Sequence, residues 1–242
     1  MPLYQTDPEK ILFIDIETVS RYHSFEEMDE DWQILWDEKS RYARGEEISP
    51  AEFYPQRAGI MAEFGKVICI SCAFLTRQAG RRQLRVRSFA GNDERKLLAD
   101  FAELLDQHFR QHLLCAHNGK EFDFPYLSRR MLINGVKLPP ALNTSGSKPW
   151  EIPHLDTMEM WKFGDRKNYT SLKLLSALFD IPTPKDDIDG SMVGKVYWVD
   201  KDLPRIVAYC QKDTISLARL YLKLEMEGDL SDEDIIIADK YV

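Results

Sequence analysis

The sequence predicts an α/β fold in which a mixed five-stranded sheet is flanked by helices. Strands come first and later strands alternate with helices, which is typical of a layered α/β domain. The chain has 242 residues, of which 44% are hydrophobic and 30% are charged, so it can form a core and remain soluble. Because no repeat or long linker interrupts it, we expect a single domain over residues 1–242.

The composition excludes several classes of protein. The first ten residues lack the features of a signal peptide, and no apolar run approaches the about 18 residues of a membrane span. The four cysteines lie in apolar stretches and suggest no disulfide framework, so we expect a cytoplasmic protein without a membrane partner. Cys69 and Cys72 lie three apart on a predicted strand and point to opposite faces, which favours buried structural cysteines over a metal site.

The net charge of −8 argues against a passive nucleic-acid coat protein. It permits an enzyme that acts on nucleic acid, because metal ions can neutralise a cluster of acidic side chains locally.

The first predicted strand is ILFIDIETVS, residues 11–20, and a helical insertion follows at about residues 19–64. Ser24 and Glu27 have the spacing of a capping box at the start of a helix. Five apolar residues then follow helical spacing: Phe25, Met28, Trp32, Leu35 and Trp36. We interpret the acidic residues of the opposite face as a solvated surface.

Residues 67–75 and 83–90 are predicted to form a hairpin of two strands. Five arginines lie on this hairpin: Arg77, Arg81, Arg82, Arg85 and Arg87. They either protect an edge strand by their charge or contact phosphates, and we favour the first interpretation. Asn92 is predicted to cap the next helix, which carries a clear apolar stripe from Leu97 to Phe109.

The rest of the chain alternates between strands, helices and loops. The expected elements are a strand at 113–116, a helix at 121–134, a loop at 139–153, a short strand and helix start within 154–163, a helix at 170–179, a loop at 182–200 and a long helix from Pro204 to about Glu227. The segment from Gly228 contains a short apolar run, for which docking on the domain and docking on a partner both stay open.

Two carboxylates interrupt the apolar first strand. Asp15 and Glu17 are two residues apart, so both side chains point to the same face of the strand. Burying two like charges costs several kcal/mol unless a cation compensates them. Either a buried arginine or a hard divalent cation can play this part.

A third carboxylate, Asp213, occupies an apolar position on the last long helix. The apolar stripe of this helix has helical spacing and comprises Ile206, Cys210, Asp213, Leu217, Leu220 and Leu224. Tyr209 lies four residues before Asp213, so its phenol and the carboxylate share a face. Taken alone, the pair is explained by a hydrogen bond that fixes helix packing.

A fourth carboxylate, Asp123, falls in the first turn of the helix that follows the strand at 113–116. An aspartate there can simply complement the helix dipole. The carboxyl end of a strand that leads into a helix is also where α/β sheets place their ligands.

Together these segments supply four oxygen ligands, a set that suits Mg²⁺ or Mn²⁺ rather than Zn²⁺. Two such ions about 3.5–4 Å apart form the clamp that is used for phosphodiester hydrolysis. One ion lowers the pKa of a bound water, and the other stabilises charge on the departing oxygen.

Three motifs carry a resemblance to a known family. They are D-x-E-T (Asp15, Glu17, Thr18), H-N-x-x-x-F-D (His117, Asn118, Phe122, Asp123) and Y-x-x-x-D (Tyr209, Asp213). In this order they resemble the DEDDy signature of 3′–5′ exonucleases of the ribonuclease H-like superfamily. The chain is most similar to stand-alone bacterial exonucleases related to the proofreading domain of family B DNA polymerases, from about residue 10 to 225.

The resemblance implies a ribonuclease H-like sheet and a role for each motif residue. Asp15 is expected to bridge two metal ions, Glu17 to bind one of them, and Asp123 and Asp213 to complete the coordination shells. Tyr209 is expected to orient the attacking water. The motif residues expected near the terminal nucleotide are Thr18, Asn118 and Phe122.

Aromatic and cationic residues outside the motifs are candidates for gripping a single strand. They are Lys148 and Trp150 in the 139–153 loop, and Lys162, Arg166, Lys167 and Tyr169 after the fifth strand. For Trp150, packing on the core as a loop anchor is an equal alternative.

The leading hypothesis is a metal-dependent 3′–5′ exonuclease that binds the 3′ end of single-stranded DNA and uses two Mg²⁺ or Mn²⁺ ions. The alternatives are a 3′–5′ exoribonuclease and a catalytically silent nucleic-acid-binding module. Silent copies tend to lose carboxylates, and all four are present here.

Overall fold

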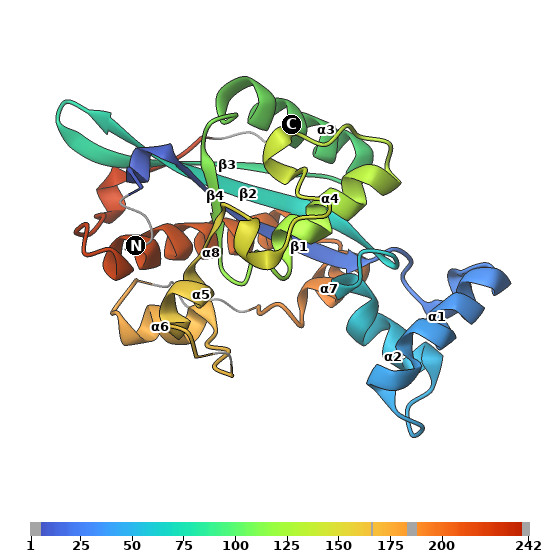
Figure 1. The fold of residues 1–242 in the computed structure, drawn as a ribbon. Helices are drawn as coiled ribbons and strands as arrows, with labels where there is room; N and C mark the ends of the chain where they lie inside the picture. Colours follow the sequence, from blue (N-terminus) through green and yellow to red (C-terminus); the bar gives the residue numbers. More distant parts are fainter. Residues whose placement is uncertain (1–5, 166, 183–187, 239–242) are drawn as a thin grey trace.

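A computed structural model of the chain describes residues 6–165, 167–182 and 188–238. Its centre is one mixed sheet with the strand order β5-β4-β1-β2-β3-β6 (Figure 1). The strands are β1 (Ile11–Ser20), β2 (Gly65–Gln78), β3 (Arg81–Ala90), β4 (Leu113–Ala116), β5 (Leu155–Asp156) and β6 (Ile235–Ile237). The predicted mixed α/β fold and its five strands are confirmed, and β6 adds a sixth strand.

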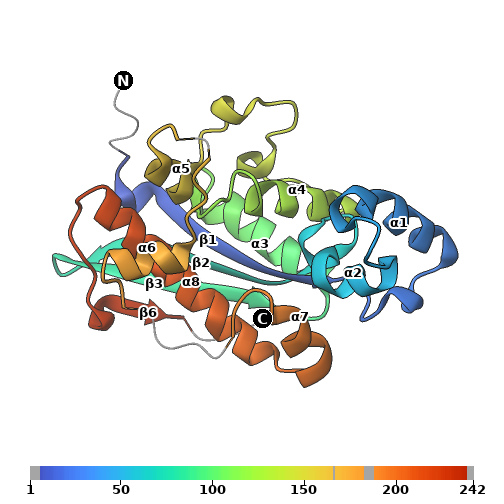
Figure 2. The ribbon, with the colours of Figure 1, turned by 90° about the horizontal axis from the view of Figure 1, so that it is seen from below.

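Helices cover both faces of the sheet. They are α1 (Glu30–Arg44), α2 (Pro50–Arg57), α3 (Glu94–His108), α4 (Asp123–Ile133), α5 (Thr157–Lys162), α6 (Leu172–Leu178), α7 (Val193–Lys195) and α8 (Leu203–Leu224). Helices α3 and α4 lie on one face, whereas α8 crosses the other with α5 and α6 beside it (Figures 1 and 2). None of the helices in the described ranges is long and apolar enough to cross a membrane.

The alternation of side chains along β1 assigns each residue to one of these two layers. Leu12 and Ile14 pack in the apolar cluster that contains α3 and α4. Ile11 and Phe13 pack in a second cluster with residues of α8. By the same two-residue period, Asp15 and Glu17 belong to the face that α8 covers.

The insertion forms a small helical unit at the end of β1 (Figure 1). Its own apolar cluster contains Trp36 and Tyr54, both fully buried. The predicted capping box at Ser24 and Glu27 is wrong, because Glu27 instead accepts a hydrogen bond from the backbone N–H of His23.

Two further expectations about this part of the fold need correction. Helix α1 begins at Glu30, and Leu35 is 48% exposed rather than part of the buried stripe. A complete capping box is present at Ser49 and Glu52, where it starts α2.

Two later expectations are also corrected. Asp93, not Asn92, caps α3, while the Asn92 side chain accepts a hydrogen bond from the Tyr197 hydroxyl. The segment expected to be a polar loop is helical over residues 193–200, because Val193 and Val196 are buried in an apolar cluster. Residues 183–187 of that segment lie outside the described ranges.

The C-terminal segment docks on the domain rather than leaving β3 as an edge. Strand β6 pairs in parallel with β3, so the proposed edge protection by arginines is not needed there. Three of the arginines instead form ion pairs: Arg77 with Glu9, Arg81 with Asp234, and Arg82 with Glu227. All four cysteines are free and buried, and Cys69 and Cys72 lie in different apolar clusters, as expected.

Candidate active site

The site is centred on the two acidic residues of β1. Asp15 pairs with Ser71 of β2, and Glu17 pairs with Cys69, in an antiparallel register that shifts between Glu17 and Thr18. The extra residue of this bulge is Ile68 of β2, and regular pairing continues beyond it to Ser20 and Gly65. The two carboxylates are therefore held on one face of β1, next to the bulge.

Helix α8 presents a thiol to this pair of carboxylates. The Cys210 thiol donates to Asp15, with 3.3 Å from Sγ to Oδ2 and 3.4 Å from Sγ to the carbonyl oxygen. The potential ligand atoms of Asp15, Glu17 and Cys210 all lie within 4.8 Å of one another. Burial raises the pKa of Cys210 well above its ordinary value, so this residue acts as a neutral thiol.

One turn of α8 brings Tyr209 and Asp213 to the same place. The Tyr209 hydroxyl is hydrogen-bonded to the Asp213 carboxylate, as their four-residue spacing predicts. Burial, followed by the negative charge of Asp213, raises the pKa of Tyr209 far above its ordinary value. Tyr209 is therefore a neutral hydrogen-bond donor at any physiological pH.

Asp123 reaches the site from the start of α4. It is only 5% exposed, and it interacts with the backbone of Ile16 on β1. Burial raises the pKa of Asp123 to about 7, although hydrogen bonds from backbone groups oppose the shift. A carboxyl group with this pKa is half protonated near neutral pH when no cation is present.

The charges of Asp213 and Asp123 act on both Asp15 and Glu17, so the four carboxylates lie in one region of the protein. Burial is the largest cause that raises the pKa of Asp15, and the charges of Asp213 and Asp123 raise it further. For Glu17 the largest cause of the raised pKa is again burial, followed by the charge of Asp15. The structure thus brings together residues that are separated by up to 198 positions in the sequence.

In the part of the chain that the structure describes, no buried arginine compensates the charges of Asp15, Glu17 and Asp123. Among the described residues, Asp15, Glu17 and Asp123 form no ion pair with a basic side chain. The two buried arginines of these ranges bind other acids: Arg130 binds Glu94, and Arg219 binds Asp232. A group of carboxylate oxygens without a basic partner in the described ranges fits a divalent cation.

The raised pKa values predict how pH and metal change stability. Carboxyl groups whose folded pKa exceeds the unfolded value bind more protons when folded, so the metal-free protein should lose stability as pH rises from about 4 to 7. A difference of one between the folded and unfolded pKa of a group corresponds to about 1.4 kcal/mol of unfolding free energy. We expect Mn²⁺ to raise the melting temperature more at pH 8 than at pH 5; equal increases at both would contradict this prediction.

Sequence reasoning missed Asp156, which fixes the turn before α4. Its carboxylate accepts hydrogen bonds from the backbone N–H groups of Asn118 and Lys120, at 2.9 and 3.1 Å, and from Met158 at 2.9 Å. Asn118 has a left-handed backbone with φ +63°, a conformation that asparagine tolerates. The signal available in the sequence was an aspartate directly at the end of a short apolar strand.

Thr18 and Phe122 lie on the wall of a cavity of about 540 Å³ that Glu17 also lines. The half-buried Asn118 contributes its backbone to the turn, and it is not among the residues that line this cavity. Of the three residues expected near a terminal nucleotide, Thr18 and Phe122 therefore share a cavity with Glu17, whereas Asn118 does not. His23 and Trp198, which sequence reasoning did not single out, line the same cavity.

The residues of the 139–153 loop lie elsewhere. Trp150 is 76% exposed and lines a different cavity, so the alternative of a core-packed loop anchor is wrong. Lys148 places its Nζ 5.4 Å from the centre of the Trp150 ring. Lys162 is similarly 4.1 Å from the Tyr169 ring. Lys167 is exposed, and Arg166 lies outside the described residues.

Three comparisons relate the chain to known proteins. A family model described as a predicted 3′–5′ exonuclease related to the exonuclease domain of PolB matches residues 60–241. A DNA polymerase of Pyrococcus glycovorans is 23% identical over 152 residues, which cover 56% of this chain and 19% of that protein. The solved family B DNA polymerase of the hyperthermophilic archaeon Pyrobaculum calidifontis aligns over 89% of this chain and 25% of its own, with 16% identity and a TM-score of 0.47.

The chain thus spans about a fifth to a quarter of the length of these polymerases. Asp15 and Glu17 precede the range that the family model matches, whereas Asp123, Tyr209 and Asp213 lie inside it. Any role of Asp15 and Glu17 therefore has to be argued from their position beside the other carboxylates and not from the family match.

Proposed function

Because the chain belongs to the family of predicted 3′–5′ exonucleases related to the exonuclease domain of PolB, we propose that it removes nucleotides from the 3′ end of single-stranded DNA in a metal-dependent reaction. The observation that carries this proposal is the convergence of four carboxylates, three of which have no cationic partner among the described residues. Such a cluster is costly to fold unless it binds cations.

The residues that would hold two Mg²⁺ or Mn²⁺ ions are Asp15, Glu17, Asp123 and Asp213. Bound there, the ions would supply an activated water and would stabilise the charge of the departing oxygen. The protein's own contribution is to hold these oxygens in place: β1, paired with β2 on both sides of the bulge, orients Glu17, and the start of α4 orients Asp123. Tyr209 stays protonated and donates to Asp213 in the metal-free protein. Once Asp213 holds an ion, the hydroxyl would be free to orient the attacking water as a donor.

Tyr209→Phe should therefore slow turnover while leaving metal binding intact. Removal of one positioned hydrogen-bond donor costs about 10²-fold in rate in comparable sites. We expect kcat to fall by about this factor, while the Mn²⁺-induced rise in melting temperature stays within error of the unmodified protein. Unchanged turnover would remove the tyrosine from the mechanism.

The test of the proposed function is a gel assay with an oligonucleotide labelled at its 5′ end. A ladder that shortens one nucleotide at a time with Mg²⁺ or Mn²⁺, and stops with EDTA, is the expected result. A matched RNA oligonucleotide separates the DNA from the RNA substrate, and a 3′-end label separates the two polarities because it releases a mononucleotide at once. Full-length DNA after incubation with either ion would overturn the proposal.

A further inference from the structure

We propose that His23 and Trp198 form a stacking subsite for the unstacked bases of a nucleic-acid single strand, in the groove that starts at Glu17. This inference rests on the proposed function, since it gives the polymer a place next to the carboxylates. It also assigns a role to the insertion, which supplies one wall of the groove. The groove is the cavity of about 540 Å³ that Glu17 and Thr18 line.

Two segments far apart in the sequence form the walls of this groove. One wall comes from the insertion: the end of α2, with Pro55 and Gln56, and η3 (Ala58–Ile60). The other wall comes from residues 190–199, which include α7. A polymer end held by the carboxylates can therefore leave the site between two protein surfaces.

An aromatic pair joins the two walls. The His23 and Trp198 rings are stacked, with their centres 5.7 Å apart and an angle of 23° between their planes. His23 is exposed, so a further ring can reach the His23 end of this stack from solvent. Every nucleobase has a π face, and base–aromatic stacking is the usual sequence-tolerant way to hold single strands.

Positive charge surrounds the same tryptophan, in a chain whose net charge is −8. The Nζ atoms of Lys66 and Lys201 lie 4.6 and 5.1 Å from the centre of the Trp198 ring. Lys195 is exposed and lines the groove itself. Lysines beside an aromatic platform match the alternating bases and phosphates of a single strand.

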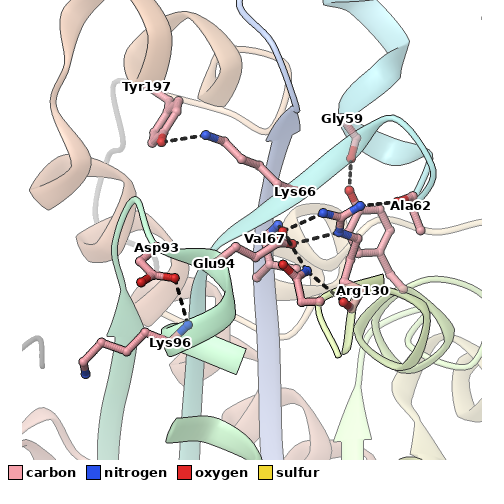
Figure 3. Close-up of polar contacts among 11 residues, drawn as sticks. Gly59, Ala62, Lys66, Val67, Asp93, Glu94, Lys96, Arg130 and Tyr197 are labelled. Carbon is pink, nitrogen blue, oxygen red and sulfur yellow. Dashed lines mark hydrogen bonds and ion pairs between the residues drawn. The ribbon is translucent and has the colours of Figure 1, made fainter. Parts of the chain in front are cut away.

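Both walls are anchored to the core of the protein (Figure 3). Lys66 of β2 donates to the Tyr197 hydroxyl at 3.0 Å, which fixes the segment that carries Trp198. On the opposite wall, the Tyr126 hydroxyl donates to the Gly59 carbonyl at 2.7 Å. A Cβ on Gly59 would lie 3.2 Å from the backbone of Val19, so the absence of a side chain lets this wall approach β1 closely.

The subsite predicts that His23 and Trp198 affect long substrates only. The variants His23→Ala and Trp198→Ala should each raise KM for a single-stranded oligonucleotide by about tenfold, the loss expected for one stacked base. Hydrolysis of the p-nitrophenyl ester of thymidine 5′-monophosphate, which has no neighbouring base, should stay within about twofold. His23→Phe keeps an aromatic ring and should restore most of the oligonucleotide affinity, and Tyr42→Ala, which removes a 98% exposed ring from α1, should change nothing.

A binding measurement keeps this test independent of cleavage. Fluorescence anisotropy of a labelled oligonucleotide, with all variants made in an Asp15→Asn background and with EDTA, should show the same tenfold loss for His23→Ala. Equal affinity with and without the two rings would overturn the stacking subsite even if the enzyme is active. An equal loss for the oligonucleotide and the p-nitrophenyl ester would also overturn it, because that result indicates a general structural role. If the unmodified protein binds the oligonucleotide tightly but cleaves neither substrate, the proposed function fails while the subsite stands.

Discussion

The variant Asp15→Asn is expected to lose about 10³-fold or more of the rate of cleavage at the 3′ end. The substitution keeps the shape of the side chain and removes one negative charge from the cluster. Electrostatic stabilisation by bound ions contributes several kcal/mol to the transition state, and each 1.4 kcal/mol is about tenfold in rate. Asp213→Asn should have a comparable effect, because the charge of Asp213 acts on the Asp15 carboxyl group. Single-turnover cleavage of a labelled oligonucleotide measures both.

The same variant should become more stable when metal is absent, which separates loss of function from loss of folding. Burial and then the charge of Asp15 raise the pKa of Glu17, so removal of that charge relieves repulsion in the folded state. We expect a higher melting temperature than that of the unmodified protein in EDTA at pH 8, and a smaller response to Mn²⁺. Asp106→Asn, which changes an exposed acid on α3, is the matched control. Near-normal cleavage by Asp15→Asn would show that the assignment of the site is wrong.

The variant Arg130→Ala should cost about 3–5 kcal/mol of unfolding free energy, the range for a buried ion pair that loses one partner. Arg130 donates to the Glu94 carboxylate through Nε and Nη2, at 2.8 and 2.6 Å, and both side chains are buried (Figure 3). Glu94 also accepts a hydrogen bond from the Val67 N–H at 2.8 Å. Without Arg130, the buried Glu94 carboxylate keeps the hydrogen bonds from the Val67 N–H and the Asn134 amide but loses its cationic partner.

Arg130 also holds the insertion, so its loss should affect the groove. Its Nη1 donates to the Ala62 carbonyl at 2.8 Å, next to the wall formed by η3. Urea unfolding followed by circular dichroism measures the change in stability, and Arg129→Ala, at the neighbouring exposed residue, serves as the control. If Arg130→Ala lowers the unfolding free energy by less than about 1 kcal/mol, the value typical of surface ion pairs, the contacts of Arg130 with Glu94 and Ala62 are not important for stability.

Local periodicity predicted the directions of three of the four carboxylates. The two-residue period of β1 placed Asp15 and Glu17 on one face, and the helical period of α8 placed Asp213 on its buried stripe near Tyr209. These residues are held by long regular elements, whose side-chain directions follow from spacing alone. That β1 and α8 lie against one another could be inferred only from the resemblance or from the structure.

Features decided by tertiary contacts could not be predicted in this way. The pairs Ser24–Glu27 and Ser49–Glu52 have the same local pattern, yet only the second forms a capping box, because Glu27 bonds to His23 instead. The β6 strand is too short for its sequence to specify a partner. The contact of His23 with Trp198 joins residues 175 positions apart, and no local signal links them.

We propose that the carboxylates form one centre for divalent ions, and anomalous scattering from crystals of the unmodified protein soaked in Mn²⁺ tests this directly. We expect manganese peaks within coordination distance, about 2.0–2.6 Å, of oxygens from Asp15, Glu17, Asp123 and Asp213. Crystals with no manganese among these side chains, and with the carboxylates turned away from one another, would contradict it.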